Sequence, residues 1–126
     1  MITIAIDGPS AAGKSTVAKG VAKKLGFVYI DTGAMYRCVT LYALKNGIDC
    51  QNDEEVVKCL PNIHITLSID GRVLLNGEDV TFDIRTQDVV DNVSHIAANK
   101  GVRLFLVDIQ RQMAKDISIV MDGRDI

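Results

Sequence analysis

The segment Gly8-Pro9-Ser10-Ala11-Ala12-Gly13-Lys14-Ser15 decides the fold, because it fits the pattern G-x-x-x-x-G-K-[ST] in full. Glycines in such a loop allow a tight turn in which successive backbone N–H groups point at phosphate oxygens. Lys14 is expected to reach the β- and γ-phosphates of a nucleoside triphosphate, and the Ser15 hydroxyl is expected to help hold Mg²⁺. The segment therefore predicts an ATP-binding protein, with phosphoryl transfer to a small acceptor as its expected chemistry.

The sequence on either side of this loop predicts the strand and the helix that the motif requires. Residues 2–6 are apolar and rich in β-branched side chains, as in a buried parallel strand. Apolar residues recur at helical spacing through residues 14–25, and Gly26 follows as a helix stop. A second buried strand is predicted at residues 27–30. This order predicts an α/β fold, a P-loop NTPase three-layer fold with a parallel sheet.

The next two predicted helices have recognisable start and stop residues. Thr32 is the predicted cap of a helix over residues 32–46, and Gly47 is its predicted stop. Asn52 is the predicted cap of a short helix that Pro61 ends. The sequence thus predicts two consecutive helices between the second strand and the next one.

The middle of the chain departs from this pattern. Residues 63–69 alternate apolar and polar side chains, and Asp70-Gly71 and Asn76-Gly77 are turn signals. We therefore expect residues 62–84 to form a small antiparallel β-sheet inserted into a single domain over residues 1–126. Helical patterns return at residues 86–98 and 102–115, and a third buried strand is predicted at residues 118–121.

Composition excludes several classes of protein. The chain has 126 residues, which suits one domain, and its 14 basic and 16 acidic residues argue against a general nucleic-acid binder. Cys38, Cys50 and Cys59 have no C-x-x-C spacing, and only His64 and His95 could assist them, so no zinc site is expected. The thiols are expected to be small buried side chains in a reducing compartment. Without a basic leader or an apolar run of roughly 20 residues, the expected location is cytoplasmic, with no membrane partner.

Charged residues follow the predicted strands at the edge where ligands bind in open α/β sheets. Asp122 follows the third strand and is a candidate magnesium ligand through water, although an ordinary strand-end carboxylate is the alternative. Arg37 and Arg124 follow the second and third strands. They are expected to grip an acceptor phosphate, and ion pairs at the surface are their alternative role.

Four blocks of sequence occur in the order typical of bacterial cytidylate kinases: IAIDGPSAAGKST, IDTGAMYR, IRTQDVVDNVSHIAANKGVR and VMDGRDI. The chain therefore resembles the N-terminal portion of that family from end to end. The resemblance implies ATP-dependent phosphorylation of CMP and dCMP to the diphosphates, in pyrimidine nucleotide metabolism, with the inserted sheet as the NMP-binding region. It implies that the ATP phosphates are held by Gly8, Pro9, Ser10, Ala11, Ala12, Gly13, Lys14, Ser15 and Thr16.

The same resemblance implies a CMP site. Its residues are Thr32, Tyr36, Arg37, Ser94, Arg103, Arg124 and Asp125. Arg37 and Arg124 would hold the CMP phosphate and act in catalysis together with Lys14. Ser94, Arg103 and Asp125 would recognise the cytosine ring, whose N4 amino donor suits an aspartate. Uracil reverses the donor and acceptor pattern, so strong discrimination against UMP is the expected consequence.

The family's chain continues past the segment DGRDI into a mobile lid, an adenine pocket and further core strands. The sequence is therefore expected to be truncated, and turnover by these 126 residues alone stays open. A monomer is expected for the full-length protein, whereas the fragment could self-associate through uncovered apolar surface. The alternatives are a nucleotide-binding fragment without turnover and another small-molecule P-loop kinase.

Overall fold

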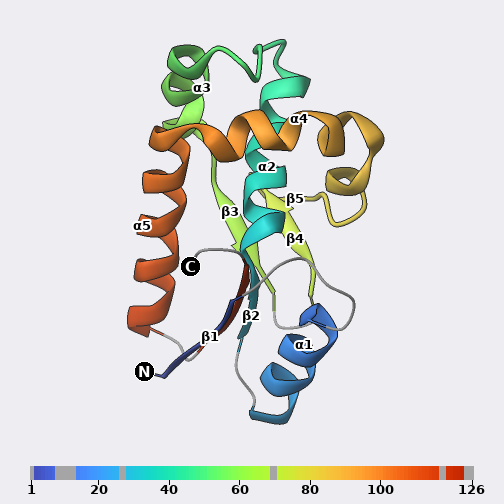
Figure 1. Cartoon of the computed structure of the whole chain (residues 1–126), viewed down its shortest axis with the longest axis vertical. Helices are drawn as coiled ribbons and strands as arrows, with labels where there is room; N and C mark the ends of the chain where they lie inside the picture. Colours follow the sequence, from blue (N-terminus) through green and yellow to red (C-terminus); the bar gives the residue numbers. More distant parts are fainter. Residues whose placement is uncertain (1, 8–13, 26–27, 69–70, 117–118, 124–126) are drawn as a thin grey trace.

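The computed structural model describes residues 2–7, 14–25, 28–68, 71–116 and 119–123, and it combines two small sheets with several helices (Figure 1). In chain order the elements are β1 (Thr3–Asp7), α1 (Lys14–Leu25), β2 (Val28–Asp31), α2 (Thr32–Lys45), α3 (Asp53–Cys59), η1 (Leu60–Asn62), β3 (Ile65–Leu67), β4 (Val73–Leu75), β5 (Glu78–Asp79), η2 (Asp83–Arg85), α4 (Gln87–Ala98), α5 (Lys100–Asp116) and β6 (Ile119–Gly123).

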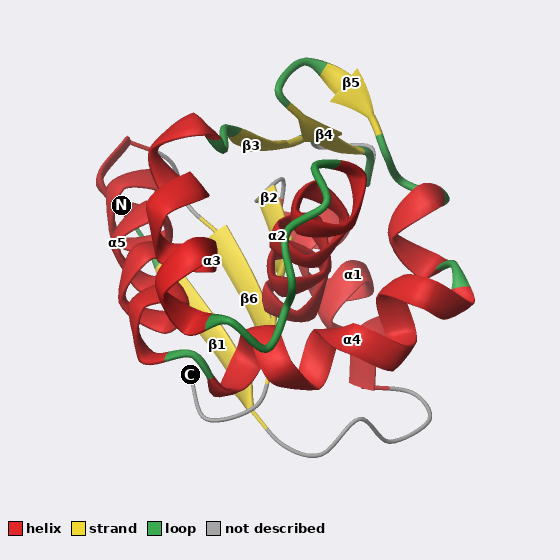
Figure 2. Ribbon diagram, turned by 90° about the horizontal axis from the view of Figure 1, so that it is seen from above, coloured by secondary structure: helices red, strands yellow, loops and turns green. Residues whose placement is uncertain are grey.

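The first sheet has the strand order β1-β6-β2, and both pairings are parallel. The last strand of the described chain therefore lies between the first two. Figure 2 shows α1 on one side of this sheet and α5 on the other. Such a placement follows from right-handed crossovers, because the chain crosses the sheet in opposite directions on its way from β1 to β2 and from β2 to β6.

Helix α2 lies at the centre of the main core. Its residues Met35, Cys38 and Val39 are fully buried. Helix α4 crosses it, as Figure 1 shows, and contributes the buried side chains of Val89 and Ile96. Because α4 and η2 pack against α2, the beginning of α2 is held firmly next to the end of β2.

The second sheet is antiparallel with the order β3-β4-β5, as the sequence predicts for the insertion. Its β4–β5 turn has Asn76 at φ 51° and Gly77 at φ 82°, the left-handed conformations of a tight hairpin turn. Strand β3 is shorter than predicted. Before Ile65, the His64 carbonyl oxygen accepts the Asn76 backbone N–H at 2.8 Å, whereas the His64 N–H donates to the Asn76 side-chain oxygen at 2.7 Å, so only one of the two bonds is of the backbone type that a strand ladder requires.

Helices α4 and α5 meet at Asn99, which is almost fully buried. Its side-chain oxygen accepts the N–H groups of Gly101 at 3.0 Å and Val102 at 3.4 Å, and therefore caps α5. The helix begins at Lys100, two residues before the predicted start. A Cβ atom at Gly101 would lie 2.6 Å from Val57 Cγ2, so glycine permits the close approach of α5 to α3.

The described surface carries several exposed apolar side chains. Phe82 is 84% exposed, and Ile2, next to the edge strand β1, is 59% exposed. Of these two residues only Ile2 adjoins the parallel sheet, because Phe82 lies between β5 and η2. Among the described residues, no helix combines the length and the apolar character that crossing a bilayer would require.

Candidate functional site

The carboxyl ends of the parallel strands form one edge of the sheet. Asp122 in β6 is in register with Ile6 in β1 and with Asp31 in β2. Helix α1 begins at Lys14, as the phosphate-loop motif predicts. The strand ends and the start of α2 thus converge where the sequence predicts a ligand crevice.

Asp31 caps helix α2, whereas the sequence analysis predicted Thr32. The Asp31 Oδ1 atom accepts the Ala34 N–H at 3.1 Å, and Thr32 is the first residue of the helix and is buried. The prediction was wrong because a carboxylate one residue earlier satisfies the free N–H groups and also interacts favourably with the helix dipole. Thr32 nevertheless stays next to the strand ends.

Arg37 folds back over the first turn of α2. Its Nη2 lies 3.4 Å from Asp31 Oδ2, and both side chains are partly exposed. Gly33 makes room for this arrangement, because a Cβ atom there would lie 3.0 Å from Arg37 Nη1. The Arg37 Nε atom is buried and has no hydrogen-bond partner in the described part of the chain. Arg37 therefore has a buried donor available for an anionic ligand.

Tyr36 and Arg103 lie near each other, although they come from α2 and α5. Burial raises the pKa of the Tyr36 hydroxyl, and the positive charge of Arg103 offsets part of this rise. The structure thus brings together two of the predicted CMP-site residues. Ser94 lies on the exposed side of α4, and no hydrogen bond joins it to Tyr36 or Arg103 among the described residues.

Several predicted site residues lie outside the described residues or have undescribed side chains. Gly8, Pro9, Ser10, Ala11, Ala12, Gly13, Arg124 and Asp125 are outside the described residues. Lys14, Ser15, Thr16 and Asp122 belong to described elements, and only their backbone positions enter the argument. Their functional assignments therefore remain predictions.

Cys38 lies one residue after Arg37 and is fully buried. Burial raises the pKa of its thiol to about 12, although the charge of Arg37 lowers it. Cys50 and Cys59 are also buried free thiols, as predicted. Cys38 is therefore protonated at neutral pH, and it acts as a packing residue beside the site and not as a nucleophile.

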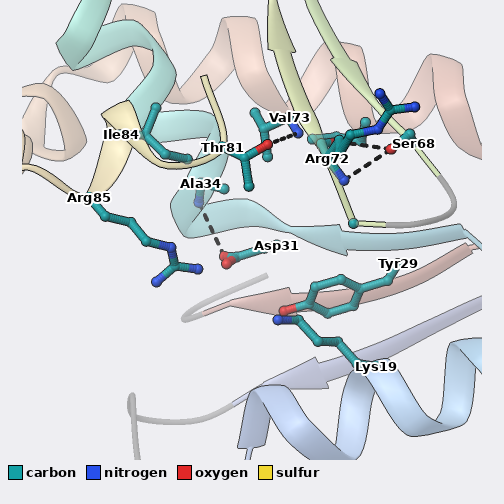
Figure 3. Close-up of a pocket in the computed structure, with 12 residues that line it drawn as sticks. Lys19, Tyr29, Asp31, Ala34, Ser68, Arg72, Val73, Thr81, Ile84 and Arg85 are labelled. Atoms are coloured by element: carbon teal, nitrogen blue, oxygen red, sulfur yellow. Dashed lines mark hydrogen bonds between the residues drawn. The ribbon is translucent and has the colours of Figure 1, made fainter. Parts of the chain in front are cut away.

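A hollow of about 40 Å³ adjoins Asp31, and Figure 3 shows the residues around it. The sequence analysis assigned no role to Lys19, Arg72 or Arg85, because no motif connects them. The hollow is lined by Lys19, Tyr29, Asp31, Ala34, Leu67, Ser68, Gly71, Arg72, Val73, Thr81, Ile84 and Arg85.

The sheet and its carboxyl edge place the chain among α/β proteins that bind ligands at the ends of parallel strands. Comparison with known families is more specific. A family model for cytidylate kinase matches residues 4–126, so the chain belongs to the cytidylate kinase family. The resemblance noted in the sequence is thereby confirmed.

Individual relatives agree with this assignment. The cytidylate kinase of Desulforamulus reducens is 54% identical over 125 residues, which are 98% of this chain and 56% of that protein. Those of Oceanobacillus iheyensis and Anoxybacillus flavithermus are 51% and 52% identical over 128 residues, with 99% of this chain covered. The chain spans 56–57% of the length of these relatives.

Proposed function

We propose that the whole protein carrying this chain transfers the terminal phosphoryl group of ATP to CMP or dCMP and forms CDP or dCDP. Family membership supports this activity, because the relatives named above are cytidylate kinases. The observation that carries the proposal is the buried Nε of Arg37, which has no partner in the described part of the chain and lies at the start of α2. An acceptor phosphate would satisfy this donor.

Arg37 and Arg124 are proposed to hold the acceptor phosphate, with Thr32 beside them. A phosphate oxygen that accepts from Arg37 Nε would also attract Nη2 away from Asp31, because the Nη2–Oδ2 distance of 3.4 Å leaves that ion pair weak. Arg37 is thus held near its working position without being bound tightly to a competing carboxylate. Such preorganisation lowers the entropic cost of binding.

Recognition of cytosine is proposed to come from Ser94, Arg103 and Asp125, with Tyr36 lining the same site. The electrostatic effect of Arg103 on Tyr36 supports this, since it requires the two side chains to be close. Arg103 is a permanent donor that suits the O2 and N3 acceptors of cytosine, and Asp125 suits its N4 amino group. UMP would leave these polar groups unpaired.

The donor site is proposed to comprise residues 8–16, with Lys14 in contact with the transferring phosphoryl group. Mg²⁺ would be held by Ser15 and, through water, by Asp122. The register supports the fit, because Asp122 lies across from Asp31 at the strand ends and Ser15 is in the first turn of α1. Hydroxyl and carboxylate oxygens are the ligands that Mg²⁺ prefers, and the bound ion would neutralise phosphate charge.

The architecture is proposed to be the P-loop NTPase three-layer fold within one domain over residues 1–126, with residues 62–84 as the NMP-binding region. The packing of Ile63, Ile65 and Ile84 into the same core as α2 supports this, because it joins the insertion directly to the acceptor side. The whole protein is proposed to be a cytoplasmic monomer with small-molecule substrates. Self-association of the present chain can be measured by light scattering.

A coupled assay for ADP release tests the proposal on the complete protein that carries this sequence. ATP and Mg²⁺ would be supplied with CMP, dCMP, UMP, AMP or shikimate as the acceptor. We expect turnover with CMP and dCMP and little with the others. Turnover with shikimate or AMP alone would favour another small-molecule kinase, and binding of ATP and CMP without CDP would favour a nucleotide-binding protein.

Arg37 itself is tested in the same assay by Arg37→Lys, which keeps the charge but removes Nε as a directed donor. The KM for CMP is expected to rise by roughly tenfold to a hundredfold, as for loss of a hydrogen bond to a charged group. Arg111→Lys, on the exposed side of α5, is the matched control. An unchanged KM for CMP in Arg37→Lys would show that Arg37 does not hold the acceptor phosphate.

A further inference from the structure

Gln110 is a buried polar residue of α5 that belongs to none of the sites described above. Its side chain is 8% exposed, and the partly buried apolar side chains of Ile109 and Met113 in the same helix pack against the main core. Burying an amide costs free energy unless its polar atoms are bonded, and an apolar side chain of the same size would avoid this cost. The presence of glutamine at this position therefore needs a physical reason.

The amide of Gln110 bonds to α2. Its Nε2 donates to Met35 Sδ at 3.7 Å, and Met35 is fully buried in the first turn of that helix. A thioether is a weak acceptor, so this bond adds little to stability. The bond is directional, however, whereas the hydrophobic attraction between the two helices is not. The contact therefore specifies how α5 is placed against the beginning of α2.

Arg103 and Gln110 lie on the same side of α5. They are seven residues apart, which is two helical turns to within about 20°, and Leu106 between them is fully buried. In α2, Tyr36 directly follows Met35, and the charge of Arg103 acts on its hydroxyl. Figure 1 shows that α5 runs in the direction opposite to α2. Two consecutive residues of α2 thus lie near two side chains on one side of α5.

The beginning of α5 is joined to α3 and not to α2. Asn99 caps α5 and donates to the carbonyl oxygen of the first residue of α3 at 3.3 Å. Gly101 allows close approach to Val57, which also belongs to α3. Because both contacts place α5 relative to α3, the placement of Arg103 against α2 requires a contact further along the helix, and Gln110 provides one.

We propose that Gln110 is a positioning residue for the acceptor site, because its bond to Met35 holds α5 where Arg103 lies beside Tyr36. This inference rests on the proposed function, in which Arg103 and Tyr36 belong to the CMP site. An apolar side chain at position 110 would keep the core filled but would remove the directional contact. A buried polar group that lowers stability while it orders a site is a pattern expected near functional residues.

Gln110→Met in the complete protein tests the proposal, because methionine keeps the unbranched shape and loses the amide. We expect the KM for CMP to rise by about threefold to tenfold, as for one neutral hydrogen bond, with kcat and the KM for ATP unchanged. The midpoint of thermal unfolding should stay the same or rise, because an apolar group replaces a buried polar one. A purely structural role predicts the reverse, a lower midpoint with an unchanged KM. Gln112→Met, on the exposed side of α5, is the matched control.

A second measurement does not depend on turnover. NMR titration of the tyrosine ring signals at alkaline pH follows the pKa of Tyr36, whose signals are assigned with Tyr36→Phe. Because the charge of Arg103 lowers this pKa, we expect a higher pKa of Tyr36 in Gln110→Met than in the parent or in Gln112→Met. An unchanged pKa of Tyr36, or an unchanged KM for CMP, would overturn the proposal.

The same measurements separate this inference from the proposed function. Absence of CMP turnover in the parent protein would overturn the kinase assignment, and a raised pKa of Tyr36 in Gln110→Met would then still show that Gln110 places Arg103. Turnover of CMP in the parent, together with the same pKa of Tyr36 in both proteins, would leave the kinase assignment standing and remove the role of Gln110.

Met35→Leu tests the bond from its other end, because leucine keeps the volume of the side chain and removes the sulfur acceptor. This variant should raise the KM for CMP as Gln110→Met does. Combining the two substitutions should give no further rise, since the first of them already removes the bond. Additive effects in the double variant would show that the contact between Gln110 and Met35 is not the cause.

Discussion

Alanine at Gly101 and at Gly20 is expected to have opposite effects on stability, although both glycines lie in helices. A Cβ atom at Gly20 has nothing within 4 Å. Gly20→Ala should therefore gain the helix propensity of alanine, about 1 kcal/mol. At Gly101 the new Cβ would lie 2.6 Å from Val57 Cγ2 and 3.7 Å from Val57 Cγ1, so α3 and α5 must move apart or Val57 must turn.

Overpacking of this kind costs about 1–3 kcal/mol, and the propensity gain offsets less than about 1 kcal/mol of it in the first turn of a helix. We expect Gly101→Ala to destabilise the protein by about 1–2 kcal/mol. The unfolding midpoint should fall by about 4–8 °C, and Gly20→Ala should raise it by about 4 °C. Thermal unfolding followed by circular dichroism measures both changes.

Val57→Ala removes the two methyl groups that the new Cβ would meet. In that background Gly101→Ala should become neutral or stabilising, and the double-mutant cycle should give a coupling energy of about 1–3 kcal/mol. An identical effect of Gly101→Ala in both backgrounds would show that the contact with Val57 is not the cause. If Gly101→Ala stabilised the protein as much as Gly20→Ala does, the close approach of α5 to α3 would be refuted.

Two further predictions concern the residues around Asp31. Asp31→Ala removes the cap of α2 and the partner of Arg37, so it should lower the free energy of unfolding by about 1–2 kcal/mol. Asp31→Asn keeps the capping oxygen and should lower it by less than about 1 kcal/mol. Urea unfolding measures both losses, and equal losses in the two variants would contradict the role of Asp31 as the cap. Cys38 predicts a pH dependence, because its pKa is raised from 9.0 to about 12 in the folded protein. The unfolded chain loses this proton first, so the stabilising contribution is complete below about pH 9 and falls as the pH rises toward about 12. Urea unfolding measured between pH 9 and pH 12 should show that the free energy of unfolding falls less steeply with pH in Cys38→Ala than in the parent protein. Identical pH dependences in the two proteins would show that the Cys38 thiol is not the cause.

Local rules predicted much of the fold correctly. Asn52 caps α3 by accepting the Glu55 N–H at 3.2 Å, and Gly47 has the positive φ of 68° expected after a helix. The Asn76-Gly77 turn and the helical stripe that begins at Lys14 were likewise predicted. Each of these features depends on residues within a few positions of one another, so the information is contained in short stretches of sequence.

Contacts between distant segments were beyond such rules. Nothing in the sequence around Asn99 shows that its side chain caps α5 and also donates to the Asp53 carbonyl oxygen at 3.3 Å. The hollow depends on the β3–β4 hairpin lying over β2 and α1, and Lys19, Arg72 and Arg85 share no spacing that would connect them. Tyr36 and Arg103 were named together only through a family resemblance, and their proximity comes from the packing of α5 against α2.

Asp31 explains why Thr32 was misassigned and why Arg37 lies where it does. One carboxylate oxygen fixes the first turn of α2, and the other holds the guanidinium that the same turn presents. A stronger ion pair would compete with an acceptor phosphate, and the absence of any pair would leave a long side chain to be ordered at binding. At 3.4 Å between partly exposed groups, the pair contributes less than about 1 kcal/mol, so the proposed acceptor phosphate would be able to displace it.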